Sequence, residues 1–200
     1  EQSKKILKAF NTVPDTCIRV NTLKITTDAI KKQLKLKNIS VEDIPYIQEG
    51  LSIKTGADTL FSEFLQTGLL YVQTASSMIP AKVLGPDAGD HVLDMCAAPG
   101  SKTTHIAALM GNRGSIDAWD VYPHKVKLIK DNAKRLGISI IHTEVRDSVK
   151  PLPFLYETYD KVLLDAPCSG LGVLGDKEEL RWGRKESDLS VFPPLQKQLI

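Results

Sequence analysis

The chain has 200 residues, of which 42% are hydrophobic and 25% are charged, and its formal net charge is +2. This ordinary globular composition predicts one or two domains with a real core, and the mildly basic charge permits nucleic-acid binding without demanding it. No apolar run approaches the roughly 20 residues that cross a membrane, and the start of the chain lacks the layout of a signal peptide. Because it also lacks an initiator Met, we expect a processed or excised piece.

The first third of the chain, residues 1–68, is predicted to be a small α+β module. Residues 17–21 alternate between apolar and polar side chains, as a strand does. Residues 26–37 predict a helix, because N-cap candidates precede an apolar stripe. Two short strand-like runs follow, at 41–47 and 51–54.

From residue 69 to residue 200 the pattern changes to alternating strands and helices. This alternation predicts a doubly wound α/β domain with a parallel sheet and right-handed crossovers. Pro80 should kink or divide the first of its helices, and a last helix should follow Pro194. Since such a sheet has further strands, we expect it to continue beyond Ile200. The predicted strands are 91–95, 115–119, 138–145 and 161–165, and the predicted helices are 75–84, 101–110 and 123–136.

The most informative stretch follows the first of these strands, which ends at Asp94. Ligands of open parallel sheets bind just beyond the carboxyl ends of the strands. The stretch lacks both the phosphate-loop pattern and the three-glycine spacing of dinucleotide binders. Its small residues predict close approach of the backbone to S-adenosylmethionine, the remaining common cofactor of such a turn. The residues assigned to this turn are Cys96, Ala97, Ala98, Pro99, Gly100, Ser101 and Lys102.

Further acids and a second lysine are placed to complete the cofactor site. Asp120 follows the turn by about 20 residues, where an acid can accept the ribose hydroxyls, although an N-cap for the next helix is an alternative and compatible role. Asp147 is placed to meet the adenine edge, or is a plain loop carboxylate. Lys102 and Lys125 could meet the methionine carboxylate or the acidic cluster, and Lys125 could equally be solvated. For Cys96 we favour burial as a small apolar side chain.

The last predicted strand ends at Asp165, and Cys168 follows in the sequence Asp-Ala-Pro-Cys. A thiol suits methylation of a pyrimidine carbon, because a thiolate that adds to the neighbouring ring carbon makes the target carbon nucleophilic. Asp165 could hydrogen-bond the cytosine edge and stabilise the developing charge. Core packing is the alternative for Cys168. Methylation of an amino group is disfavoured, because that chemistry needs no thiol.

Two motifs carry a resemblance to a known family. The sequences D-M-C-A-A-P-G-S-K-T-T-H (94–105) and D-A-P-C-S-G-L-G (165–172) closely resemble the Nol/Nop/Sun (RsmB/Fmu-like) family of RNA cytosine-5 methyltransferases. Supporting matches are R-V-N-T-L-K (19–24), Q-T-A-S-S-M (73–78) and R-L-G (135–137). The resemblance implies a Rossmann-like methyltransferase domain that binds S-adenosylmethionine through the turn and the acids named above. It also implies that the N-terminal module contacts RNA, either rRNA or tRNA.

The chain departs from the family pattern in three places. Ser101 replaces a common glycine, and residues 175–179 are acidic where the family is often basic. In the family, the attacking cysteine lies in a later Thr/Ser-Cys motif, which these 200 residues do not contain. The cysteine matching Cys168 then assists product release by removing the proton from carbon 5. A catalytically silent module that binds cofactor and RNA is therefore the alternative function.

Two clusters of positive charge are candidates for contact with RNA. Arg181 and Arg184 flank Trp182, which combines charge with a stacking surface, although a solvated loop is an equal alternative. The lysines of residues 31–37 are better explained as the wet face of a helix. Three widely spaced cysteines without a C-x-x-C pair argue against disulfides and zinc, so we expect a metal-free, cytoplasmic monomer without membrane contact.

Overall fold

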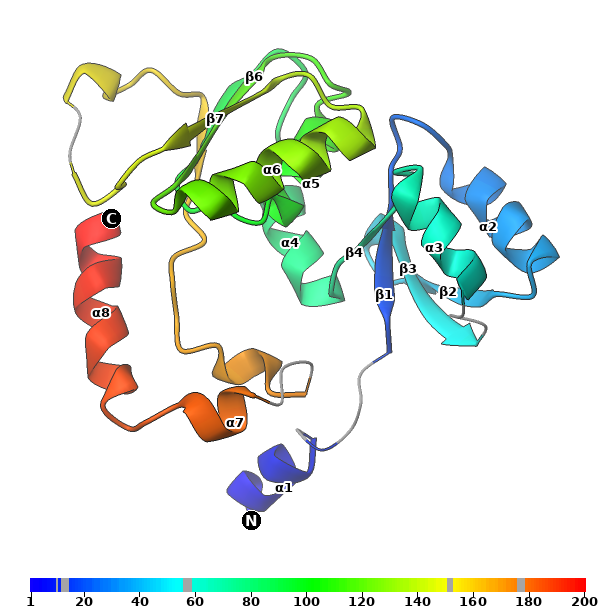
Figure 1. Cartoon of the computed structure of the whole chain (residues 1–200), viewed down its shortest axis with the longest axis horizontal. Helices are drawn as coiled ribbons and strands as arrows, with labels where there is room; N and C mark the ends of the chain where they lie inside the picture. Colours follow the sequence, from blue (N-terminus) through cyan, green and yellow to red (C-terminus); the bar gives the residue numbers. More distant parts are fainter. Residues whose placement is uncertain (10, 12–14, 56–58, 151–152, 176–178) are drawn as a thin grey trace. The chain divides into compact units, whose positions relative to one another are not determined.

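Two compact units make up the chain in the computed structural model (Figure 1). One unit is Thr16–Asp165, and the other combines Glu1–Asp15 with Ala166–Ile200. Within the part of the chain that the structure describes, no helix is long and apolar enough to cross a membrane. The described residues are 1–9, 11, 15–55, 59–150, 153–175 and 179–200.

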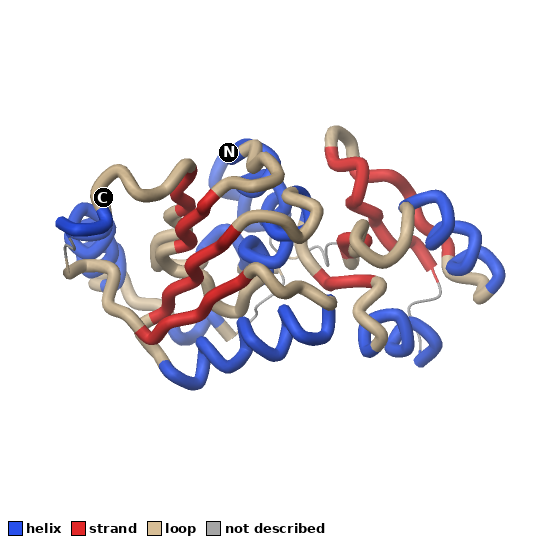
Figure 2. The backbone as a smooth tube through the Cα atoms, turned by 90° about the horizontal axis from the view of Figure 1, so that it is seen from above, coloured by secondary structure: helices blue, strands red, loops and turns tan. Residues whose placement is uncertain are grey.

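The larger unit contains two four-stranded sheets, seen as separate groups of strands in Figure 2. The first sheet is antiparallel and has the strand order β2-β3-β1-β4. Side chains from its strands and from α2 and α3 form one buried cluster that includes Ile18, Leu34 and Leu51. Its elements are β1 (Cys17–Val20), α2 (Thr27–Leu36), β2 (Ser40–Ile44), β3 (Ile47–Thr55), α3 (Thr59–Gln66) and β4 (Leu70–Val72).

The predictions for this sheet were right about β1, α2 and two later strands, but α3 and β4 were missed. The helix α2 begins where the sequence predicts, because the Thr26 hydroxyl accepts a hydrogen bond from the Ala29 amide at 3.3 Å. Ile30 and Leu34 then lie one turn apart and are fully buried. β4 follows residue 68 and pairs with β1, so the antiparallel sheet extends past that residue. The domain boundary at residue 68 stays a proposal.

The second sheet is parallel throughout, with the strand order β7-β6-β5-β8. Its strands alternate with helices along the chain, which confirms the predicted α/β class. In Figure 1, α6 crosses β6 and β7 on one face of the sheet. The elements are α4 (Ala75–Leu84), β5 (His91–Asp94), α5 (Ser101–Leu109), β6 (Ser115–Asp120), α6 (Pro123–Leu136), β7 (Ile141–Val145), η1 (Pro153–Leu155) and β8 (Lys161–Leu163).

Two helices tolerate prolines that the sequence analysis treated as breaks. α4 runs through Pro80 without interruption, so the expected division there was wrong. One lost backbone bond is offset there by full burial of Met78 and Ala81. In the smaller unit, α8 contains Pro193 and Pro194 and begins at Asp188, not after the prolines, since an acid in the first turn favours a helix start. The elements of this unit are α1 (Gln2–Ala9), η2 (Leu171–Val173), α7 (Leu180–Gly183) and α8 (Asp188–Leu199).

Candidate active site

An acidic residue follows each strand of the parallel sheet at its carboxyl end. Asp94 and Asp120 are the last residues of β5 and β6, and Asp147 and Asp165 each follow the end of β7 and β8 by two residues. Because parallel strands end at the same edge, the strand order places these acids along one side of the sheet in the sequence Asp147, Asp120, Asp94 and Asp165. The structure therefore places the three predicted acids, Asp120, Asp147 and Asp165, at one edge together with Asp94.

The turn between β5 and α5 is closed tightly against its neighbours. The Ala97 amide donates to the Trp119 carbonyl at 2.8 Å, and the Gly100 amide donates to the Ala97 carbonyl at 2.7 Å. Gly100 has a φ of +97°, and a Cβ there would lie 3.2 Å from the Cα of Ile129 on α6. Only glycine combines this backbone conformation with so close an approach of the helix. The turn is thus packed closely against α6, and Ala97 and Gly100 are both buried.

Asp94 is a buried carboxyl at the base of this turn, with 1% of its surface exposed. Its Oδ2 accepts a hydrogen bond from the Thr103 hydroxyl at 2.7 Å, whereas its Oδ1 has no partner among the described residues. Burial raises the pKa of Asp94 to about 6, an effect that Asp165 strengthens and that Thr103 and Lys102 oppose. A buried acceptor without a partner is what a hydrogen-bond donor from a ligand would satisfy.

Lys102 and Asp165 form an ion pair across the turn. Lys102 lies in the first turn of α5, and its Nζ is 2.5 Å from the Asp165 Oδ2. The lysine side chain is 16% exposed and the aspartate 52%, so solvent screens the pair from one side only. Lys102 therefore joins the acidic cluster, one of its two predicted roles. Lys125 instead lies over the ring of Tyr122, with its Nζ 4.8 Å from the centroid.

Asp120 and Asp147 each make local contacts in their loops. The Asp120 Oδ1 accepts a hydrogen bond from the Tyr122 amide at 3.1 Å. Tyr122 is the N-cap of α6 and its side chain makes no capping bond, so the alternative of Asp120 as N-cap was wrong. The Asp147 Oδ1 accepts from the Val149 amide at 3.2 Å, and its Oδ2 is 3.8 Å from the Lys150 Nζ. Both carboxylates are partly exposed and can still reach a ligand.

Cys96 is partly buried within the turn. Burial raises the pKa of its thiol to about 11, and the neighbouring carboxylates of Asp94 and Asp120 add to this rise. The thiol therefore stays neutral at physiological pH, where only the thiolate is a strong nucleophile. Cys96 has the properties of a packed small side chain, the reading that the sequence favoured.

Of the residues predicted to act on the acceptor, Asp165 is the last residue of the larger unit, and the others lie in the smaller unit. Cys168 is exposed in the loop that follows β8. On α7, Trp182 is 88% exposed, and the Arg181 guanidinium donates to the Asn11 Oδ1 at 2.9 Å. Arg184 follows α7 and pairs with Asp188 at 3.6 Å. Trp182 thus offers an exposed aromatic face, whereas both arginines also make contacts within the smaller unit. Residues 176–178 of the acidic stretch lie outside the described residues.

The sequence analysis missed a set of buried polar side chains that join the antiparallel sheet to α5. Glu49 on β3 accepts a hydrogen bond from the His105 Nε2 at 2.6 Å, and both side chains are buried. Burial lowers the pKa of His105 and keeps it neutral. Burial alone would raise the pKa of Glu49, but His105 and Lys82 outweigh it, so Glu49 stays ionised. The available signal for such buried polar side chains was a charged residue within an apolar strand pattern, as at Arg19 on β1, which is also buried.

Comparison with known proteins decides the family. A sequence profile described as 16S rRNA methyltransferase RsmB/F matches residues 81–200, and a profile of the ferredoxin-like domain of the same proteins matches residues 1–59. The chain belongs to the RsmB/F methyltransferase family. The resemblance seen in the two sequence motifs is thereby confirmed, and so is the predicted fold class, an α+β module followed by a Rossmann-like sheet.

Individual members of the family match most of this chain. It is 37% identical to the probable ribosomal RNA small subunit methyltransferase B of Bacillus subtilis, over 100% of this chain and 45% of that protein. It is 44% identical to the ribosomal RNA small subunit methyltransferase F of Erwinia tasmaniensis, over 86% of this chain and 37% of the relative. A solved methyltransferase homologue from Pyrococcus horikoshii is 35% identical, with a TM-score of 0.87 over 100% of this chain and 63% of that structure. The chain therefore spans less than half the length of the two curated relatives.

Proposed function

We propose that this chain carries the S-adenosylmethionine site and part of the acceptor site of an enzyme that methylates carbon 5 of a cytosine in 16S rRNA. The observation that carries the proposal is the sheet edge, where four acids surround a glycine turn at the start of α5. The printed names of the relatives favour rRNA over tRNA as the substrate. A cytoplasmic, metal-free monomer belongs to the same proposal.

The residues of the turn suit this cofactor. Its small side chains at Ala97, Ala98 and Gly100 allow the backbone to approach the ligand closely. The Asp94 Oδ1, buried and without a described partner, can accept a hydrogen bond from the ammonium of the methionine part. We assign Asp120 to the ribose hydroxyls and Asp147 to the adenine edge. When bound, the cofactor supplies an electrophilic methyl group on a sulfonium.

Further residues of the turn and its surroundings complete the proposed site. The backbone of Cys96, Pro99 and Ser101 lines it beside the small residues. The Lys102–Asp165 pair lies at its β8 side, where Lys102 can also meet the methionine carboxylate. Lys125 remains a candidate for the same carboxylate through movement of its flexible side chain away from Tyr122. These assignments make the cofactor site a property of the larger unit alone.

On the acceptor side, we assign the chemistry of the pyrimidine ring to Asp165 and Cys168. Cytosine carbon 5 becomes nucleophilic only after a thiolate adds to carbon 6, and Asp165 can hydrogen-bond the base as charge develops. After methylation, the proton on carbon 5 must leave and the carbon–sulfur bond must break to restore the aromatic ring. Cys168, exposed and three residues after Asp165, is assigned to removal of that proton. Arg181, Trp182 and Arg184 are assigned to RNA contact.

The test combines cofactor binding with trapping of the RNA. The chain is titrated with S-adenosylmethionine by calorimetry and then incubated with the cofactor and a 16S rRNA fragment that carries 5-fluorocytosine, which blocks proton removal. We expect cofactor binding, and the intact mass reports any covalent adduct. An adduct that persists in Cys17→Ala but is lost in Cys168→Ala would reassign Cys168 as the attacking thiol.

Two outcomes separate the proposal from its alternative. Absence of S-adenosylmethionine binding by the folded chain would overturn it. If the chain binds the cofactor and forms no adduct, the full-length Bacillus subtilis relative, with its Cys168 equivalent replaced by alanine, is incubated with the cofactor and a 16S rRNA fragment that carries ordinary cytosine. Accumulation of a stable RNA adduct there supports the release role of Cys168. Unchanged turnover there would favour the catalytically silent reading of this segment.

A further inference from the structure

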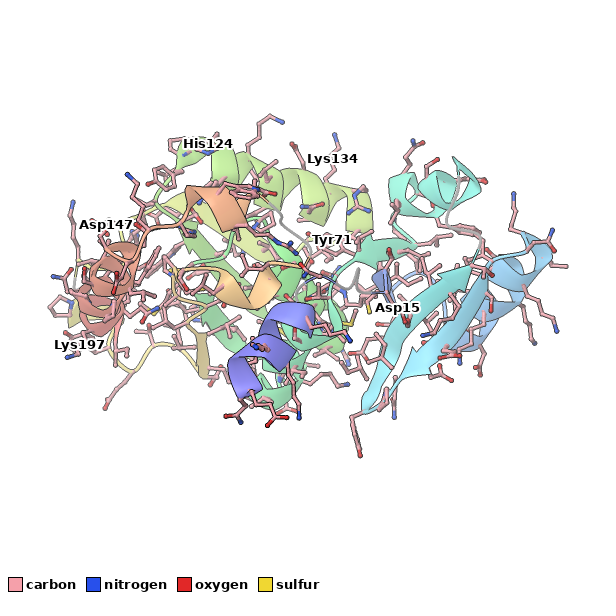
Figure 3. All side chains as sticks on the ribbon, turned by 90° about the horizontal axis from the view of Figure 1, so that it is seen from below. Asp15, Tyr71, His124, Lys134, Asp147 and Lys197 are labelled. Carbon is pink, nitrogen blue, oxygen red and sulfur yellow. The ribbon has the colours of Figure 1, made fainter. Side chains whose placement is uncertain are left out.

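Two arginines, Arg19 and Arg135, stack on the ring of the same tyrosine, Tyr71, where the antiparallel sheet meets α5 and α6. The Tyr71 side chain on β4 is 8% exposed and lies among the inner side chains in Figure 3. The Arg19 Cζ is 5.0 Å from the centroid of its ring, and the Arg135 Cζ is 5.4 Å from it. Guanidinium groups stack favourably on aromatic rings, so Tyr71 fixes both arginines in place.

The first arginine reaches the cofactor turn directly. Arg19 lies on β1 and is 2% exposed. Its Nη1 donates to the Ser101 carbonyl at 2.6 Å and to the Gln73 Oε1 at 2.5 Å, and its Nη2 donates to the Thr104 Oγ1 at 2.9 Å. Burial lowers the pKa of Arg19 to about 10, which leaves it charged at neutral pH. One planar group thus holds a backbone oxygen and a side chain in the first turn of α5.

The second arginine, Arg135, reaches the turn through the side-chain amide of Asn132. The Arg135 Nη2 donates to the Asn132 Oδ1 at 3.0 Å, and the Asn132 Nδ2 donates to the Pro99 carbonyl at 3.0 Å. Because the arginine can only donate, it requires the amide oxygen on its own side and so directs the amide nitrogen toward Pro99. Arg135 also donates to the Leu65 carbonyl on α3 at 2.5 Å and to the Leu70 carbonyl on β4 at 3.3 Å, which ties α6 to the antiparallel sheet and its helix.

We propose that Arg19 and Asn132, the latter oriented by Arg135, are positioning residues of the cofactor site. They hold the carbonyls of Pro99 and Ser101 on the two sides of Gly100, and so fix the conformation of the turn. The antiparallel sheet is then a working part of the cofactor site and not only an RNA-contacting module. The inference depends on the proposed function for the identity of its ligand, but not for the fixed geometry of the turn.

The chain offers a matched control at Asn21, directly after the strand that carries Arg19. Asn21 is 3% exposed, and its Nδ2 donates to the carbonyls of Gly68 and Leu136, each at 2.8 Å. It therefore joins the antiparallel sheet to the C-terminal end of α6, away from the cofactor turn. A variant at Asn21 loses buried hydrogen bonds at the same junction without touching the turn. It separates a positioning role from general stabilisation.

The experiment compares three variants of the 200-residue chain at a temperature where thermal unfolding shows each to be folded. Asn132→Asp keeps the acceptor for Arg135 but loses the donor for Pro99, and Arg19→Lys keeps the charge but loses the planar fork. S-adenosylhomocysteine is titrated into each by calorimetry. We expect about tenfold weaker binding for Asn132→Asp and Arg19→Lys, and a change of about twofold or less for Asn21→Ala.

A second readout needs no ligand. Hydrogen exchange of the Gly100 and Thr104 amides, whose bonds close the turn, should be at least about fivefold faster in Arg19→Lys and Asn132→Asp than in the parent chain or Asn21→Ala. Equal exchange and equal affinity in all three variants would overturn the inference. If the parent chain does not bind the ligand, the proposed function fails, and the exchange pattern alone then decides whether the turn is held as described.

Discussion

The cofactor turn and the segment 166–200 carry the two halves of the proposed chemistry, yet they are built in opposite ways. In the turn and the start of α5, Thr103, Thr104 and His105 are completely buried and Gly100 lies against α6. In the described part of 166–200, Leu199 is the one buried residue, while Cys168 is exposed and Trp182 is 88% exposed. The turn is held in place by buried side chains, whereas the segment 166–200 presents its functional side chains to solvent.

The difference teaches which half of the reaction needs a preformed site. A small cofactor of constant shape is bound best by a rigid turn, because little conformational entropy is then lost on binding. RNA is recognised over a broad surface through exposed charges and aromatic faces. Substitutions in the turn should therefore cost folding stability and cofactor affinity together. Substitutions in 166–200 should change RNA contact with little effect on stability.

The largest expected effect is that of Gly100→Ala. An alanine would have to keep the φ of +97°, which is unfavourable for a residue with a Cβ, and its Cβ would lie 3.2 Å from the Ile129 Cα. We expect a loss of ~2–4 kcal/mol in the free energy of unfolding, from backbone strain plus overpacking. S-adenosylmethionine binding should be lost as well. Urea denaturation and calorimetric titration measure the two effects.

Two other glycines are controls for this variant. At Gly89 the φ is +106°, and a Cβ would meet no described heavy atom within 4 Å, so Gly89→Ala should cost only the strain of about 1–2 kcal/mol. At Gly172, in the smaller unit, a Cβ also has open space and no positive φ is recorded, so the change should stay within about 0.5 kcal/mol. Equal losses at Gly89 and Gly100 would contradict the role given to the contact with α6.

The second prediction uses the raised pKa of Asp94. Its folded pKa of about 6 exceeds the ordinary value of 3.8, so the folded chain binds the proton more tightly. The stability from this group is fully present below about pH 4 and is lost as the pH rises through 6, a change of ~3 kcal/mol. Asp94→Asn should remove this fall and leave the ligand-free chain more stable than the parent at pH 7.

Urea denaturation from pH 4 to pH 8 checks this prediction. The quantity of interest is the difference in unfolding free energy between Asp94→Asn and the parent at each pH, since other carboxyls titrate in both. Asp131→Asn, which removes an exposed carboxylate paired with Lys127 on α6, is the control for loss of one charge. A difference that does not change with pH would show that Asp94 is not held in a buried, protonation-favouring site.

The local features of the larger unit could be predicted from the sequence. Apolar runs that end in acids marked the strands of the parallel sheet, and the small residues before Gly100 marked the turn. These features are set by neighbours along the chain, so the pattern contains them. The prolines inside α4 and α8 were judged by local rules alone, and packing or an acid in the first helical turn overrode those rules.

The features that escaped prediction depend on distant partners. β4 has three residues, too few for a recognisable alternation, and becomes a strand by pairing with β1. Arg19 fitted the polar position of an alternating strand, but its hydrogen-bond partner Ser101 lies 82 residues later. Nothing in the sequence near Asn132 points to Pro99, which it contacts across 33 residues. The candidate ligand contacts could thus be predicted, whereas the side chains that hold them could not.

The third prediction compares two thiols. Cys96 has a pKa of about 11, so its thiolate fraction at pH 7.5 is below about one in a thousand, and its side chain is partly covered. Cys168 is exposed. In a Cys17→Ser background, iodoacetamide should label Cys168 at least ~30-fold faster than Cys96. Peptide mass spectrometry over a time course measures both rates, and faster labelling of Cys96 would reverse the assignment of the packed and the reactive thiol.

The smallest expected effect is that of Trp182→Ala. Because the side chain is 88% exposed, its removal should change the free energy of unfolding by no more than about 0.5 kcal/mol. If the ring stacks on a base, affinity for a single-stranded 16S rRNA fragment should fall about tenfold, within the usual range for one base–aromatic contact. Tyr156→Ala, which removes another exposed aromatic from the larger unit, is the control and should leave RNA affinity unchanged. Fluorescence anisotropy measures both, and equal affinities of the two variants would show that the open aromatic face of α7 does not bind RNA.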